Sequence, residues 1–87
     1  MDRRKGKREW SVYILRCSDG SLYTGITKDV QQRVNAHNSG KGAQYTRTRR
    51  PVELLYKENN MNRSKALSRE IAIKALDKKA KEQLVVL

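Results

Sequence analysis

The stretch WSVYILRCSDGSLYTGI, residues 10–26, decides the fold of this 87-residue chain. Two β-rich runs flank Asp19 and Gly20, a dipeptide typical of hairpin turns. A two-residue turn would put Tyr13 and Tyr23 on opposite faces of the hairpin, whereas a three-residue loop with a left-handed Gly20 puts both rings on one face. We favour the three-residue loop because it gives the cleaner apolar face, made of Val12, Ile14, Leu22 and Ile26.

The rest of the chain predicts three further elements and a basic loop. A helix runs from about Asp29 to Asn38, with Gly40 as its stop signal. The loop GKGAQYTRTRR leads to Pro51, which opens a strand, VELLYKE. A longer helix extends from about Asn62 to Lys79, where apolar residues cover a wide arc. The final KEQLVVL is either a last turn of that helix or an edge segment.

The resulting order, ββαβα, predicts one α+β domain with a three-stranded antiparallel sheet flanked by helices. A chain of 87 residues leaves little room for a second module, so the functional site must lie on the core fold. The predicted divisions are a basic segment over residues 1–9, the domain over 10–80, and an extension of the last helix or a tail over 81–87. The basic segment is either a solvated flexible tail or an arm that binds nucleic acid.

Charge and cysteine content narrow the class of partner and the compartment. Twenty Lys and Arg residues against nine Asp and Glu give a formal net charge of +11, which favours a polyanionic partner. The single cysteine, Cys17, excludes an internal disulfide, and no Cys/His spacing matches a zinc site. The apolar runs are too short to span a bilayer and the N-terminal segment lacks a signal-peptide region, so we expect a cytoplasmic monomer without a membrane partner.

Two pairs of charged or polar residues are spaced to meet on helices. Arg33 and His37 lie four residues apart on the first helix, on the stripe that also carries its valines. They either form part of a polar site or have structural roles, with Arg33 reaching solvent and His37 capping the last turn. Glu70 lies four residues before Lys74, a spacing that an exposed ion pair also explains.

Three ordered blocks of the sequence resemble the GIY-YIG nuclease superfamily. These blocks are VYILRCSDGSLYTGIT, GKGAQYTRTRRPVELLY and SKALSREIAIKAL. They are similar in particular to the small stand-alone bacterial members, an uncharacterised family related to the catalytic domains of excision-repair and structure-specific nucleases. The resemblance covers about residues 10–80 and implies a GIY-YIG-like domain.

The resemblance also implies roles for five residues. Tyr23 matches the tyrosine that activates the attacking water, and Tyr13 the tyrosine that supports it across the hairpin. Arg33 matches the arginine that contacts the scissile phosphate, and Glu70 the carboxylate that holds one divalent ion, Mg²⁺ or Mn²⁺. His37 falls where several members keep a histidine that assists proton transfer. Phosphodiester hydrolysis needs a base, a Lewis acid and a fixed cation, and these residue types fit those needs.

The sequence departs from the superfamily pattern at two positions. Ile26 stands where some members have a lysine, so one phosphate contact is missing unless Lys28 replaces it. No asparagine follows Glu70, and there is no accessory domain that would choose a target. Two functions therefore stay open. The first is a metal-dependent endonuclease that acts on DNA, including branched or damaged DNA, in repair or recombination. The alternative is a nucleic-acid-binding module with little or no catalytic activity.

The loop over residues 40–50 predicts a surface that follows nucleic-acid phosphates. Its basic residues are interleaved with an aromatic ring, a combination suited to backbone contact and base stacking. The predicted contacts are Lys41, Tyr45, Arg47, Arg49 and Arg50. The plainer interpretation is a solvated basic loop.

Overall fold

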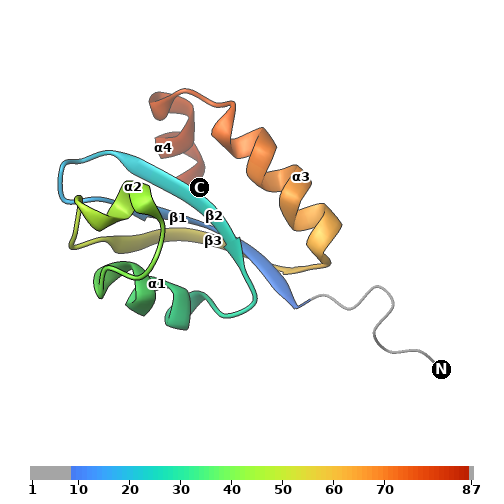
Figure 1. Cartoon of the computed structure of the whole chain (residues 1–87). Coiled ribbons are helices and arrows are strands. Elements are labelled where there is room, and N and C mark those ends of the chain that lie inside the picture. The colour runs from blue at the N-terminus through green and yellow to red at the C-terminus, as the bar shows by residue number, and fades with distance from the viewer. Residues whose placement is uncertain (1–8, 87) are drawn as a thin grey trace.

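A three-stranded antiparallel sheet forms the centre of the computed structural model, which describes residues 9–86. Its strands are β1 (Trp10–Arg16), β2 (Leu22–Thr27) and β3 (Glu53–Met61), and the order β2-β1-β3 puts β1 in the middle. Helices cover both faces of the sheet (Figure 1). The fold is therefore the predicted α+β domain, with two short helices added to the ββαβα order.

The hairpin has the predicted three-residue loop. Tyr13 pairs with Gly25 and Leu15 pairs with Tyr23, which is the register that puts both tyrosines on one face. Gly20 has a φ of 85°, and the Cys17 N–H closes the loop by donating to the Ser21 carbonyl at 2.8 Å. A left-handed residue in a three-residue loop shifts the register by one, so this glycine decides which side chains share a face.

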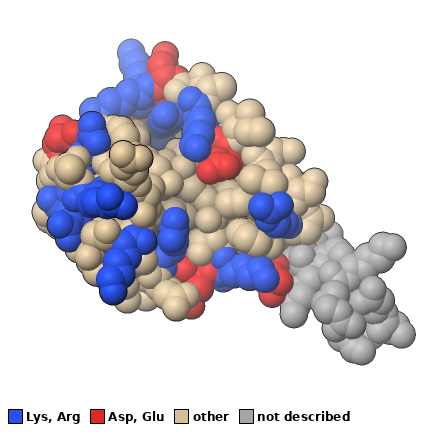
Figure 2. Space-filling view, in the orientation of Figure 1, with Lys and Arg blue, Asp and Glu red and all other residues tan. Residues whose placement is uncertain are grey.

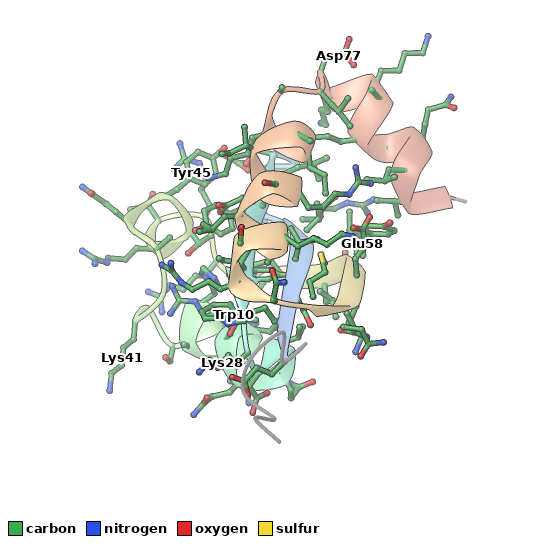
Figure 3. All side chains as sticks on the ribbon, turned by 90° about the vertical axis from the view of Figure 1, so that its right-hand side faces the viewer. Trp10, Lys28, Lys41, Tyr45, Glu58 and Asp77 are labelled. Atoms are coloured by element: carbon green, nitrogen blue, oxygen red, sulfur yellow. The ribbon has the colours of Figure 1, made fainter. Side chains whose placement is uncertain are left out.

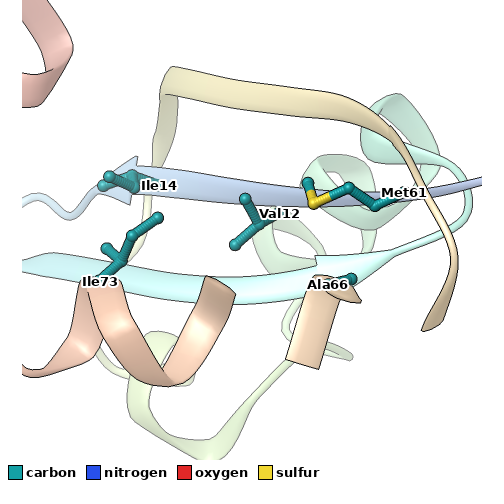
Figure 4. Close-up of a cluster of buried hydrophobic side chains, with 5 residues drawn as sticks. All are labelled: Val12, Ile14, Met61, Ala66 and Ile73. Carbon is teal, nitrogen blue, oxygen red and sulfur yellow. The ribbon is translucent and has the colours of Figure 1, made fainter. Parts of the chain in front are cut away.

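Each face of the hairpin belongs to its own buried cluster. On one face Tyr13 and Leu15 pack with Val30 and Val34 of helix α1 (Val30–Asn38). The other face packs against helix α3 (Arg63–Lys74), as Figure 4 shows; its buried residues are Val12, Ile14, Met61, Ala66 and Ile73. The central strand therefore separates two small cores, and the tyrosine side faces α1.

Local signals explain the ends of α1. The Asp29 side chain accepts the Gln32 N–H at 3.0 Å and so caps the N-terminus. Gly40, with a φ of 84°, follows the C-terminus. The segment predicted as a loop over residues 40–50 contains one further helical turn, α2 (Gln44–Arg47).

The prediction of one long helix over about Asn62 to Lys79 is wrong, because the chain forms two helices there. Helix α3 ends at Lys74 and helix α4 (Lys78–Val86) begins after Asp77, whose carboxylate accepts the Ala80 N–H at 2.8 Å. This cap starts a new helix in a new direction (Figure 1). Leu84 then packs against the α3 side of the sheet. Residues 1–8 of the predicted basic segment, and residue 87, lie outside the described residues.

Candidate active site

Tyr13 stands at the centre of a buried polar cluster on the α1 side of the sheet. Its side chain is 1% exposed, and its hydroxyl lies 2.9 Å from His37 Nε2. Gly25, its partner across the hairpin, makes room for the ring, because a Cβ there would lie 2.6 Å from the Tyr13 hydroxyl. The glycine of the β2 sequence LYTGIT is therefore required for the position of Tyr13.

His37 is fully buried and hydrogen-bonded through both ring nitrogens. Its Nδ1 lies 2.7 Å from Thr46 Oγ1, and the Thr46 hydroxyl donates to the Ala43 carbonyl at 3.0 Å. Because that hydroxyl proton is used, His37 Nδ1–H donates to Thr46 and Nε2 accepts from Tyr13. The Ala43 N–H also approaches Nδ1, but at 3.4 Å it is the longer contact and does not decide the tautomer.

The surroundings set the protonation of both groups. Burial raises the pKa of Tyr13 to about 12; the nearby Arg33 opposes this increase, and the charges of Tyr23 and Glu70 add to it. Burial lowers the pKa of His37, and the positive charge of Arg33 lowers it further. At neutral pH Tyr13 is therefore a protonated donor and His37 a neutral acceptor.

Tyr23 connects this cluster to the surface. Its ring centroid lies 5.2 Å from that of His37 and 6.4 Å from that of Tyr13. Tyr45 of α2 stacks on Tyr23 at 6.1 Å with an interplanar angle of 21°, and the Arg49 guanidinium lies 3.9 Å from the Tyr45 ring centroid. The half-buried Tyr23 is thus the member of the tyrosine–histidine group that reaches solvent.

Glu70 approaches from the opposite helix. It lies on α3, its side chain is 18% exposed, and its carboxylate is 3.4 Å from Lys74 Nζ. The negative charge of Glu70 is one of the causes that raise the pKa of Tyr13, so Glu70 lies within electrostatic range of the cluster. Within residues 9–86 no group of three or more His, Cys, Asp or Glu side chains is arranged to hold a metal. A single carboxylate is nevertheless a donor set that Mg²⁺ accepts when substrate phosphates and water complete its coordination.

The predicted nucleic-acid contacts divide into engaged and free side chains. Arg49 pairs with Asp19 at 3.1 Å, and Arg50 donates to the main-chain carbonyls of Arg47 (2.9 Å) and Asn38 (3.3 Å). Lys28 pairs with Glu9 at 3.3 Å and lies over Trp10, at the end of the sheet away from Asp77 (Figure 3). Lys41 and Arg47 are exposed, and basic side chains gather on the α1 and α2 side of the molecule (Figure 2).

Several residues of the site were not predicted from the sequence. Thr46 fixes the His37 tautomer, and Gly42 leaves room for His37, since a Cβ at Gly42 would lie 2.3 Å from Nδ1. Lys74 and Lys81 line a groove of about 280 Å³ beside Tyr23. The spacing from Glu70 marks Lys74 only as half of an ion pair, and no local pattern marks the other three residues, because their roles depend on neighbours that the fold brings close.

Comparison with known proteins identifies this arrangement. Residues 9–83 match the GIY-YIG catalytic domain, so the chain belongs to the GIY-YIG family. Within that class it belongs with the small bacterial UPF0213 proteins. The UPF0213 protein SERP0126 of Staphylococcus epidermidis is 54% identical over 74 residues, which cover 85% of this chain and 90% of that protein. The UPF0213 protein DP2720 of Desulfotalea psychrophila is 54% identical over 77 residues, covering 87% of this chain and 70% of that protein.

Solved structures agree with this assignment. The solution NMR structure of the UPF0213 protein BH0048 from Bacillus halodurans is 47% identical, has a TM-score of 0.57, and is matched over 88% of this chain and 82% of that chain. The protein EF2693 from E. faecalis is 40% identical with a TM-score of 0.56, over 90% of this chain and 83% of that chain. No helix in residues 9–86 combines the length and apolar character needed to cross a membrane.

Proposed function

We propose that this protein is a metal-dependent phosphodiesterase of the endonuclease type that acts on DNA. The observation that carries the proposal is the hydrogen bond of 2.9 Å between Tyr13 and His37, buried directly behind the solvent-reaching Tyr23 and beside Arg33. A buried polar network whose members are all hydrogen-bonded holds its side chains in one arrangement. In this proposal that rigidity keeps Tyr23 and Arg33 in fixed positions at the surface.

Each residue of the cluster has a separate role in this proposal. Tyr23 would contact the attacking water as the tyrosinate, after losing its own proton to solvent, and would then receive the proton of that water, since it is the tyrosine that reaches solvent. Tyr13 stays protonated and holds its neighbours in place through His37. Arg33, half-buried on α1, supplies a fixed positive charge for the phosphoryl oxygens, on which negative charge develops during displacement.

Glu70 is the residue that would hold the divalent ion in this proposal. When bound, such an ion supplies Lewis-acid stabilisation of the phosphate and of the leaving oxygen. Lys74, which now pairs with Glu70, would then be released to contact phosphate. The GIY-YIG match supports nuclease chemistry for the domain, and the basic surface supports a nucleic-acid substrate.

A nicking assay tests the proposal. Supercoiled plasmid and branched DNA are incubated with the protein and Mg²⁺ or Mn²⁺, beside the Tyr23→Phe variant and a chelator control. We expect metal-dependent nicking by the wild type, and loss of nicking in Tyr23→Phe without loss of DNA binding. A wild type that binds these DNAs but cleaves none of them would favour the binding module. A fully active Tyr23→Phe would remove Tyr23 from the mechanism.

A further inference from the structure

The groove beside Tyr23 lies between elements that are far apart in the sequence. It is lined by three consecutive residues of β2, by Tyr45 of α2, and by one lysine each from α3 and α4. Its lining residues are Leu22, Tyr23, Thr24, Tyr45, Lys74 and Lys81. Its volume of about 280 Å³ is that of roughly nine water molecules, enough for a phosphate group with part of its sugar.

The groove is electropositive and has main-chain donors. Two of its six lining residues are lysines and none of the described lining residues is acidic, although Lys74 pairs with the neighbouring Glu70 at 3.4 Å. Because β2 is an edge strand, alternate main-chain N–H and C=O groups along it point away from the sheet. This combination of mobile cations and fixed N–H donors suits an anion with several oxygens.

Thr24 provides an independent sign that a ligand is bound here. Thr24 is only 3% exposed, yet its Oγ1 makes no hydrogen bond to any group within residues 9–86. A buried hydroxyl without a partner is unfavourable and uncommon in native proteins, so a partner from outside the chain is the simplest explanation. Thr24 is one of the residues that line the groove, on the same face of β2 as Leu22.

We propose that this groove binds a second DNA phosphate, next to the one that is cleaved. The Thr24 hydroxyl donates to a phosphate oxygen, and Lys74 and Lys81 neutralise its charge. Tyr23 lines the same groove, so the subsite positions the strand across the reacting tyrosine. The inference rests on the proposed nuclease function, but it concerns binding and is tested without turnover.

The test measures affinity for a fluorescent branched DNA in chelator at several salt concentrations. Lys81→Gln is the diagnostic variant because, unlike Lys74→Gln, it does not leave Glu70 without its lysine partner. Removing one phosphate contact should lower the ratio of affinities at 50 and 200 mM salt by about threefold. The matched control is Lys79→Gln, which removes the same charge from an exposed position of the same helix and should change this ratio little.

Thr24→Val gives a second readout, because valine keeps the shape and removes the hydroxyl. If Thr24 contacts phosphate, DNA affinity falls while the thermal midpoint stays unchanged or rises. An unchanged DNA affinity in both Thr24→Val and Lys81→Gln would overturn the subsite, whether or not the wild type cleaves DNA.

NMR titrations with inorganic phosphate and with DNA distinguish a free anion from a DNA phosphate as the ligand of the groove. Shifts at Thr24 with free phosphate, but none with DNA, would assign the groove to a small anion and overturn the DNA assignment.

Discussion

Tyr13 and Gly25 face each other across the hairpin so closely that a β-carbon at position 25 would lie 2.6 Å from the tyrosine hydroxyl. The ring can reach His37 only because this position lacks a side chain. Gly25→Ala should therefore displace the Tyr13 hydroxyl and lower the free energy of unfolding by about 1–3 kcal/mol, the usual cost of overpacking. Denaturant unfolding measures this change, and wild-type stability in the variant would show that the ring moves without cost.

Removing the Tyr13 hydroxyl tests the buried hydrogen bond itself. Tyr13→Phe keeps the ring and leaves His37 Nε2 without a donor, so we expect a loss of about 1–3 kcal/mol in unfolding free energy. Tyr45→Phe is the matched control, since the Tyr45 ring is partly exposed and stacks through its face. Equal losses in the two variants would mean that the Tyr13–His37 bond contributes nothing specific.

The protonation of His37 predicts a pH dependence of stability. Its pKa in the folded protein is depressed below 6.5 by burial and by Arg33, so below pH 6.5 the unfolded chain takes up a proton that the folded chain does not. Stability should therefore fall with decreasing pH, with a limiting slope of about 1.4 kcal/mol per pH unit. Because the chain has one histidine, NMR titration of a tag-free protein reports it directly. A folded-state midpoint at or above 6.5 would contradict the prediction.

Glu70→Gln distinguishes two possible roles of Glu70, as a metal ligand or as half of a surface ion pair. The change keeps side-chain volume and removes the charge, so metal-dependent nicking should collapse while DNA binding in chelator persists or tightens. Loss of the pair with Lys74 should cost less than about 1 kcal/mol of stability. Thermal midpoint, affinity in chelator and nicking are measured on one preparation. An active wild type and an equally active Glu70→Gln would exclude Glu70 as the metal ligand.

Substitutions of the loop arginines should have different effects, depending on whether the arginine has hydrogen-bond partners within the protein. Arg47→Gln, at an exposed position, should lower the slope of log affinity against log salt by about 1 without changing the thermal midpoint. Arg50→Gln should instead cost about 1 kcal/mol of stability, because its guanidinium donates to two main-chain carbonyls. If both variants change only the salt slope, the Arg50 hydrogen bonds do not stabilise the loop.

The sequence predicts the structure best where the chain has only a few possible arrangements to choose from, as in the hairpin. The hairpin has only two simple registers, and the apolar alternation of Val12, Ile14, Leu22 and Ile26 selects between them. The break after α3 was missed because apolar residues continue through Leu76 at helical spacing, and the Asp77 cap outweighs that periodicity. Periodicity reports which face is apolar, whereas capping decides where the chain turns.

The candidate site could be predicted only in part, for a related reason. Helical spacing alone brings Arg33 and His37 together, and strand parity brings Tyr13 and Tyr23 together. The partners of the loop arginines depend on the folded arrangement: Arg49 pairs with Asp19, thirty positions away. Arg49 also lies against Tyr45, so stacking of a base on that face would require the arginine to move.

The pairing of Cys17 with Ser21 at the end of the hairpin also limits how the length of this gene product can change. Deleting one of the three loop residues between them leaves a two-residue turn that can close on the same pair, so Tyr23 keeps its face. Deleting one residue within β2, such as Leu22, instead moves every following side chain of that strand to the opposite face. Tyr23 would then point toward α3, and Ile26 toward α1. A single codon lost within the strand therefore exchanges its polar and apolar faces, whereas a codon lost in the loop does not.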